Sequence, residues 1–173
     1  MTPWGTSDTQ REVAPGITSH STASHGGYHL DRQRQARVEQ LFPAFRTFAG
    51  GPWYEEDQDW AVVALAFPEH FSAEDLRHAL RTAKHIGGCV TAWIESLDGA
   101  SIRIRVGAWI AENAENYEVG CLGSAEPYPA WNVQLMRIGD GQSTAVRMAS
   151  YPAKSIYRPA EVEAFRAEAA ATA

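Results

Sequence analysis

Apolar and polar positions follow two different spacings along the chain. In the first half, apolar side chains recur every three or four residues, which places them on one side of a helix. This spacing predicts helices over residues 32–42, 60–67 and 73–85, and the acidic residues before the second of these suit a helix start. Asp31 and Ser72 precede the first and third helices and can accept hydrogen bonds from their free N–H groups.

Other segments have the spacing of strands. Residues 16–20 and 27–30 flank a turn of small residues and predict a hairpin, in which Gly26 or Gly27 supplies the positive φ. Residues 101–106 alternate with period two, the clearest strand pattern in the chain. The strands predicted after the first half cover residues 89–96, 101–106, 117–122, 132–138 and 144–151, and residues 139–141 join the last two.

These elements predict an α+β fold. A helical N-terminal half with a small hairpin leads into an antiparallel β meander, which is closed by a C-terminal helix beginning at Arg158-Pro159. Gly87-Gly88 is the one plausible boundary, so residues 1–87 and 88–173 form two segments that we expect to pack as one unit.

Charge and composition narrow the classes of function. The formal net charge is −6, and both halves of the chain contribute to it, so the basic excess of a non-specific nucleic-acid binder is missing. The N-terminus lacks the pattern of a signal peptide, and the longest apolar run, residues 60–67, is too short to span a membrane. The chain has only two cysteines, Cys89 and Cys121, too few for the disulfide framework of a secreted domain, so the sequence predicts a soluble cytoplasmic protein. No cofactor is expected.

One candidate catalytic arrangement centres on His25. Histidine titrates near neutral pH, and Gly26-Gly27 after it would let a substrate approach the backbone closely. A carboxylate from residues 55–57, with Glu56 as the main candidate, would orient the ring for acid–base chemistry on a nucleotide-like or protein substrate. The alternative interpretation is a tight turn in which Ser24 and His25 bond free amides.

A second candidate is the acidic segment at residues 55–59, which we interpret as a surface that contacts a basic partner protein, with aromatic residues as anchors. The predicted partner-binding residues are Trp53, Tyr54, Glu55, Glu56, Asp57, Asp59 and Tyr128. On a helix, three of the carboxylates could instead hold Mg²⁺, or they could simply carry the charge expected at a helix start. His20, His25 and His29 form no set of zinc ligands by spacing, so no metal site is predicted.

Four arginines are predicted to lie on the sheet of the second half. Arg103 and Arg105 would share one face of a strand, and Arg137 and Arg147 lie in the predicted hairpin. They form either an anion-binding surface or the solvated side of the sheet.

Four segments carry a resemblance to a known family: residues 2–5 (Thr-Pro-Trp-Gly), 21–30, 53–61 and 67–71. In these segments the chain resembles an uncharacterised domain-of-unknown-function family of proteobacterial plasmids, integrative elements and phages. The resemblance covers about residues 1–85. It implies no activity, but it implies a place among the accessory proteins of mobile DNA, where antagonists of host defence are common.

Two functions therefore remain open. The acidic charge and the resemblance favour a non-catalytic inhibitor of a host defence complex, of the anti-CRISPR or antirestriction kind, which would occupy a basic surface of that complex. The alternative is an enzyme, a hydrolase or transferase, that uses His25 and a carboxylate of residues 55–59. A dimerisation module is a third hypothesis, so self-association also stays open.

Overall fold

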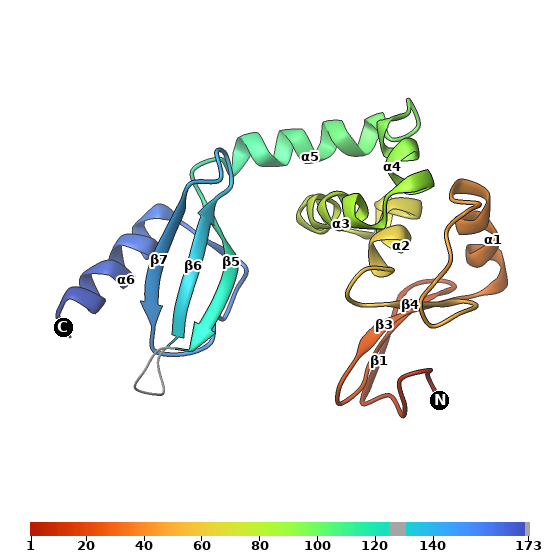
Figure 1. Ribbon diagram of the computed structural model, residues 1–173, viewed down its shortest axis with the longest axis horizontal. Coiled ribbons are helices and arrows are strands. Elements are labelled where there is room, and N and C mark those ends of the chain that lie inside the picture. Colours follow the sequence, from red (N-terminus) through yellow and green to blue (C-terminus); the bar gives the residue numbers. More distant parts are fainter. Residues whose placement is uncertain (125–130, 172–173) are drawn as a thin grey trace. The chain divides into compact units, whose positions relative to one another are not determined.

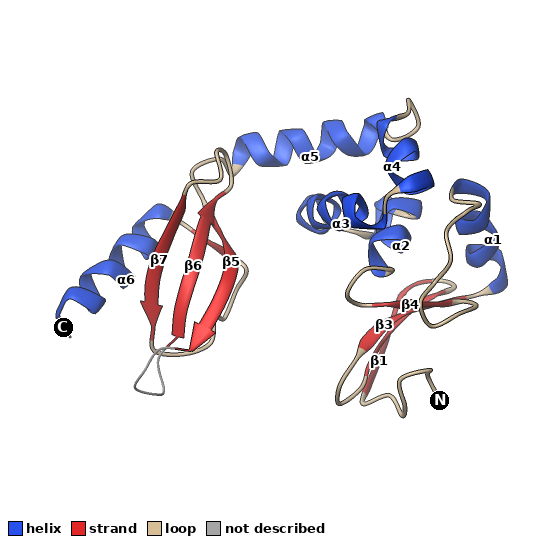
Figure 2. Cartoon of the chain, viewed as in Figure 1, coloured by secondary structure: helices blue, strands red, loops and turns tan. Residues whose placement is uncertain are grey.

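The computed structural model describes residues 1–124 and 131–171 of the chain (Figure 1). The chain forms two compact units, Met1–Gly107 and Ala108–Ala173. Each unit combines helices with an antiparallel sheet (Figure 2), so the predicted α+β class is confirmed. The division between the units follows Gly107, whereas the sequence pointed to Gly87-Gly88.

The N-terminal unit starts with an antiparallel sheet in the order β1-β2-β3-β4. Its strands are β1 (Thr9–Ala14), β2 (Ile17–Ser21), β3 (Gly26–Leu30) and β4 (Trp53–Glu55). Strands β2 and β3 form the predicted hairpin, which closes where the N–H of Thr22 donates to the carbonyl of His25 (2.7 Å). Because β1 and β4 were not predicted, the description of this half as helical is only partly right.

The rest of this unit is helical. Its helices are α1 (Arg32–Leu41), α2 (Trp60–Ala66), the short 3₁₀ helix η1 (Pro68–His70), α3 (Ala73–Ile86), α4 (Gly88–Glu95) and the first part of α5 (Ala100–Glu112), which continues past Gly107. The predicted helix starts are confirmed: the Asp31 carboxylate accepts the N–H of Arg34, and Ser72 forms a capping box with Asp75. Helix α2 is buried from Ala61 to Ala66, between the sheet and helices α1 and α3, and forms the centre of the core.

Two predicted strands are wrong. Residues 89–96 lie in α4 and residues 101–106 lie in α5. In α5, Ile102 and Val106 are buried four residues apart, while Ile104 between them is 73% exposed. The alternating pattern of Ile102, Ile104 and Val106 therefore also fits a helix with Ile102 and Val106 on its buried side and Ile104 in solvent. The burial of Ile102 and Val106 shows that the helix is the structure that forms.

Arg103 and Arg105 consequently do not form one face of a strand. The Arg103 guanidinium donates to the carbonyls of Ile94 and Ser96 at the end of α4. Arg105 donates to the carbonyls of Pro68 (2.8 Å) and Phe71 (2.6 Å). Both guanidinium groups bind backbone carbonyls of the N-terminal unit, so the predicted anion-binding surface has no support from them.

Replacing Arg103 by methionine is expected to lower the free energy of unfolding by about 1–2 kcal/mol, because the carbonyls of Ile94 and Ser96 lose a charged donor. Urea unfolding followed by tryptophan fluorescence measures the change. Arg147→Met is the control, since Arg147 is exposed on a strand and its replacement should change the stability by less than about 0.5 kcal/mol. Equal effects of the two substitutions would contradict the assigned role.

The C-terminal unit confirms the remaining predicted elements. Its sheet has the order β7-β6-β5-β8, and its elements are β5 (Tyr117–Ser124), β6 (Trp131–Arg137), β7 (Ser143–Met148), β8 (Ile156–Tyr157) and α6 (Pro159–Ala171). Val162 of α6 is fully buried in a core formed with Val133 and Leu135 of β6. Arg137 pairs with Asp140 in the turn of its own hairpin.

Among the described residues, no helix is both long enough and apolar enough to cross a membrane.

Candidate functional site

Two loops at one end of the N-terminal sheet bring together residues that are 30 positions apart. His25 immediately precedes β3, and Glu55 ends β4. The pairing of β3 with β4 places Gly27 opposite Glu55, and the N–H of Glu56 continues the ladder by donating to the carbonyl of Gly26 (3.1 Å). The register of the sheet therefore brings His25, Glu55 and Glu56 together; we call these three side chains the His25 cluster.

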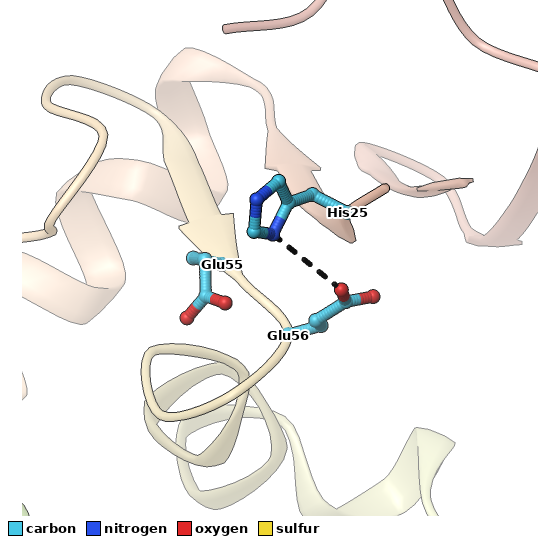
Figure 3. A group of neighbouring side chains, drawn as sticks. All are labelled: His25, Glu55 and Glu56. Atoms are coloured by element: carbon cyan, nitrogen blue, oxygen red, sulfur yellow. Dashed lines mark ion pairs between the residues drawn. The ribbon is translucent and has the colours of Figure 1, made fainter. Parts of the chain in front are cut away.

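The side chains of the His25 cluster lie close to one another (Figure 3). Nδ1 of His25 is 3.9 Å from Oε1 of Glu56, and one nitrogen or oxygen atom of each of the three side chains lies within 4.8 Å of the others. The side chains of His25 and Glu56 are about half exposed, whereas Glu55 is only 8% exposed. At 3.9 Å the imidazole and the Glu56 carboxylate form no hydrogen bond, so both remain available to a ligand.

Gly26 lies against the Glu56 side chain and the backbone of β2. A β-carbon at residue 26 would collide with Oε2 of Glu56 and would lie 3.0 Å from the carbonyl oxygen of His20. The sequence suggested that the glycines admit a substrate to the backbone. At residue 26, the carboxylate of Glu56 fills the space beside the backbone that a substrate would need.

Glu55 is a buried carboxylate. Its Oε2 accepts the N–H of Gln58 (3.3 Å). Burial raises the pKa of Glu55, and the negative charge of Asp57 raises it further, against the lowering effect of the backbone hydrogen bonds. In the part of the chain that the structure describes, no lysine or arginine forms an ion pair with Glu55 or Glu56.

Comparison with family models identifies the segment that contains this cluster. The model described as "Domain of unknown function (DUF7007)" matches residues 1–98, which is more than half of the chain. The chain belongs to the DUF7007 family. The expected membership of an uncharacterised family is confirmed, and the match runs past residue 85 to include all of α4. The comparisons with curated proteins and with solved structures gave no match.

A second cluster in the DUF7007 domain surrounds Trp53. Its ring lies 4.5 Å from that of His29, 5.2 Å from His20 and 5.8 Å from Trp4, between ring centroids. The hydroxyl of Ser7 lies 2.9 Å from Nδ1 of His20, and burial together with the charge of His29 lowers the pKa of His20. His20 and His29 thus pack against tryptophan, and neither belongs to the His25 cluster.

The predicted partner-binding surface is not a continuous surface of the DUF7007 domain. Residues 53–59 form a strand and a turn rather than the first turns of a helix, and their burial differs from residue to residue. Tyr54 is 1% exposed and donates its hydroxyl to Gln35, and Glu55 and Asp59 are also buried. Glu56 and Asp57 remain exposed and Trp53 is half-buried, while Tyr128 lies outside the described residues. Because Glu55, Glu56 and Asp59 do not share a helix, the helical Mg²⁺ site considered from the sequence is excluded.

A pocket of about 320 Å³ adjoins the His25 cluster. Its lining includes Glu56 and Trp60, together with hydroxyl groups from β1, β2 and β3. These hydroxyls belong to Thr9, Ser19, Ser21 and Tyr28. Sequence reasoning missed them, although the alternation of β2 places Ser19 and Ser21 on one face. Glu56 belongs to the cluster and also lines the pocket, so a molecule bound in the pocket could contact the Glu56 carboxylate.

A larger pocket of the N-terminal unit, about 680 Å³, has fewer reactive side chains in its wall. Asp31 in its wall caps α1, and Arg34 donates to the carbonyl of Pro15 while lying over the ring of Phe67. The described lining contains no histidine or cysteine, so it holds neither a general base near neutral pH nor a thiol nucleophile.

Proposed function

We propose that the DUF7007 domain of this chain is an enzyme of the hydrolase or transferase class, with its active site at the His25 cluster. The observation that carries this proposal is the meeting of His25 and Glu56, 3.9 Å apart, where Glu56 also lines a pocket. An imidazole beside a carboxylate is the common arrangement for taking up and returning a proton. The distance would shorten when a substrate closes the site.

The pocket suggests the class of substrate. Tyr28 and Trp60 offer aromatic surfaces, Ser21 offers a hydroxyl, and the Ser19 hydroxyl, which donates to the carbonyl of Arg11, can still accept a hydrogen bond. An aromatic side chain can stack on a flat ring of the ligand, and nearby hydroxyls can hydrogen-bond the polar groups that this ring carries. A nucleotide-like substrate is therefore the first class to test, and a protein side chain is the second.

The non-catalytic inhibitor remains the second proposal. The exposure of Glu56 and Asp57, together with the net charge of −6, favours it, because exposed carboxylates attract a basic surface. The burial of Tyr54, Glu55 and Asp59 removes three of its predicted contacts. This second proposal includes three further points: the protein comes from a mobile genetic element, its partner is a defence complex, and it acts in the cytoplasm.

The enzyme proposal is tested by turnover. The full chain is incubated with a nucleoside triphosphate, NAD⁺ and bis(p-nitrophenyl) phosphate, and we expect many equivalents of product per protein molecule from at least one of them. His25→Ala should lower the rate by about 100-fold or more, whereas His85→Ala, at an exposed position on α3, should not change it.

The opposite result would favour the inhibitor. No turnover of these three probes, combined with one-to-one capture of a defence complex from a bacterial host, would contradict the enzyme proposal. Charge reversal at Glu56 and Asp57 should then weaken the capture without unfolding the protein.

A further inference from the structure

We infer that His25, Glu55 and Glu56 bind a divalent transition-metal cation. The inference deepens the proposed function, because it rests on the same three side chains and names the cofactor that they would use. With a cation bound, His25 acts as a ligand and not as a free base, while the reaction class stays the same.

The geometry of the three side chains fits one cation. Metal–nitrogen and metal–oxygen bonds of about 2.0–2.2 Å place the ligand atoms of one ion about 3–4 Å apart. The ligand atoms of the His25 cluster lie within 4.8 Å of one another before any ion is bound. Because His25 and Glu56 are half exposed, small rotations of their side chains can close the remaining gap.

The buried Glu55 carboxylate is an independent reason to expect a cation. It is more than nine-tenths buried, and one of its oxygens lies within 4.8 Å of the ligand atoms of the other two side chains (Figure 3). The Glu56 carboxylate lies beside it, and neither carboxylate has an ion pair from a lysine or arginine of the described chain. A buried charge without a counter-charge is costly, and a cation removes that cost.

The backbone around the cluster fixes two of the ligands. The hydrogen bond from the N–H of Glu56 to the carbonyl of Gly26 holds the turn after β4 against the start of β3. The missing side chain at Gly26 lets the Glu56 carboxylate lie over this backbone, on the side of His25. Main-chain contacts thus hold the backbone of the cluster in place, and the half-exposed side chains of His25 and Glu56 can turn toward an ion.

The ligand types indicate which cation would bind. One imidazole and two carboxylates suit Mn²⁺, Fe²⁺ or Zn²⁺ better than Ca²⁺, which prefers six or more oxygens. Three protein ligands leave coordination positions open for water or substrate, as in catalytic rather than structural sites. Such a cation polarises a bound oxygen and makes water a better nucleophile near neutral pH.

Binding of Mn²⁺ to the full chain tests the inference. Mn²⁺ is preferred to Zn²⁺ as the probe because the thiols of Cys89 and Cys121 would also bind zinc. Isothermal titration and the loss of the free Mn²⁺ EPR signal should both give one equivalent per chain. Glu55→Gln and His25→Asn should each weaken binding by at least about tenfold, since each removes one ligand.

Matched controls separate ligand loss from general effects. Glu12→Gln removes an exposed carboxylate from β1 of the same sheet, and His85→Asn removes an exposed imidazole; both should bind Mn²⁺ like the wild type. Glu55→Gln keeps the size of the side chain and its bond to the N–H of Gln58, and circular dichroism confirms its fold. Mn²⁺ should raise the melting temperature of the wild type and leave that of Glu55→Gln unchanged.

The inference and the proposed function can fail separately. Absence of Mn²⁺ binding, or binding that Glu55→Gln and His25→Asn do not weaken, would overturn the cation site. Turnover that requires His25 but persists in the presence of a chelator would also overturn the cation site, and it would leave the enzyme proposal intact. One equivalent of Mn²⁺ bound at these ligands without turnover of any probe would support the cation site and weaken the enzyme proposal.

Discussion

Replacing Gly27 by alanine is expected to destabilise the N-terminal unit by about 3 kcal/mol or more. Gly27 has a φ of +151°, a backbone conformation that costs a residue with a side chain about 1–3 kcal/mol. Its new β-carbon would collide with the carbonyl oxygen of Tyr54 and the ring of Trp4, and overpacking adds about 1–3 kcal/mol. The loss would be a large fraction of the 5–15 kcal/mol that is typical of a folded domain. Urea unfolding monitored by tryptophan fluorescence measures it.

Gly5→Ala is the matched control for this prediction. Gly5 also has a positive φ, +120°, but no atom lies within 4 Å of the position that its β-carbon would take. The substitution therefore carries the cost of the backbone conformation without the collision. If both variants lost the same stability, the contact of Gly27 with Tyr54 and Trp4 would have no energetic importance.

These glycines show how far turn chemistry can be read from a sequence. The pair Gly26-Gly27 correctly predicted a hairpin in which one of the two has a positive φ. Its further interpretation, open access for a substrate, fails because Trp4, Tyr54 and Glu56 fill the space beside the glycines. Local backbone requirements are visible in the sequence, whereas the atoms that arrive from other segments are not.

The same limit explains which elements were predicted. Helix starts at Asp31, Ser72 and Pro159 have chemical signals in the sequence, and all three are present. Residues 89–96 are a short apolar run and residues 101–106 alternate with period two; both patterns also fit a helix, and packing decides between the two structures.

The candidate site was predicted in part. His25 and Glu56 were paired as alternative catalytic residues because their types suit proton transfer, and the structure brings them within 4 Å of each other. Glu55 was assigned to a partner surface, although it is buried. Four acidic residues in five positions look like a solvated patch, and only the pairing of β4 reveals which of them turn inward.

Asp59 is the second inward carboxylate, and its loss is the second large effect that we expect. It is 6% exposed and accepts the N–H of Phe48 (2.8 Å). Asp59→Ala removes the charged acceptor of this partly buried hydrogen bond and should cost about 1–3 kcal/mol. Asp59→Asn keeps an acceptor oxygen at the same place and should be much less destabilising at pH 7. Chemical unfolding of both variants and the wild type measures the difference.

The pH dependence of the Asp59→Asn variant provides a further check. Burial raises the pKa of Asp59 above its ordinary value of 3.8, although hydrogen bonds from the backbone of Phe48 and Glu55 lower it in part. A carboxyl group whose pKa is raised by folding favours the folded state below pH 3.8, and this contribution is lost as the pH rises through the folded-state value. Asparagine does not titrate, so Asp59→Asn should gain stability relative to the wild type between pH 4 and pH 7. A constant difference across this range would mean that the ionised carboxylate carries no cost in the fold.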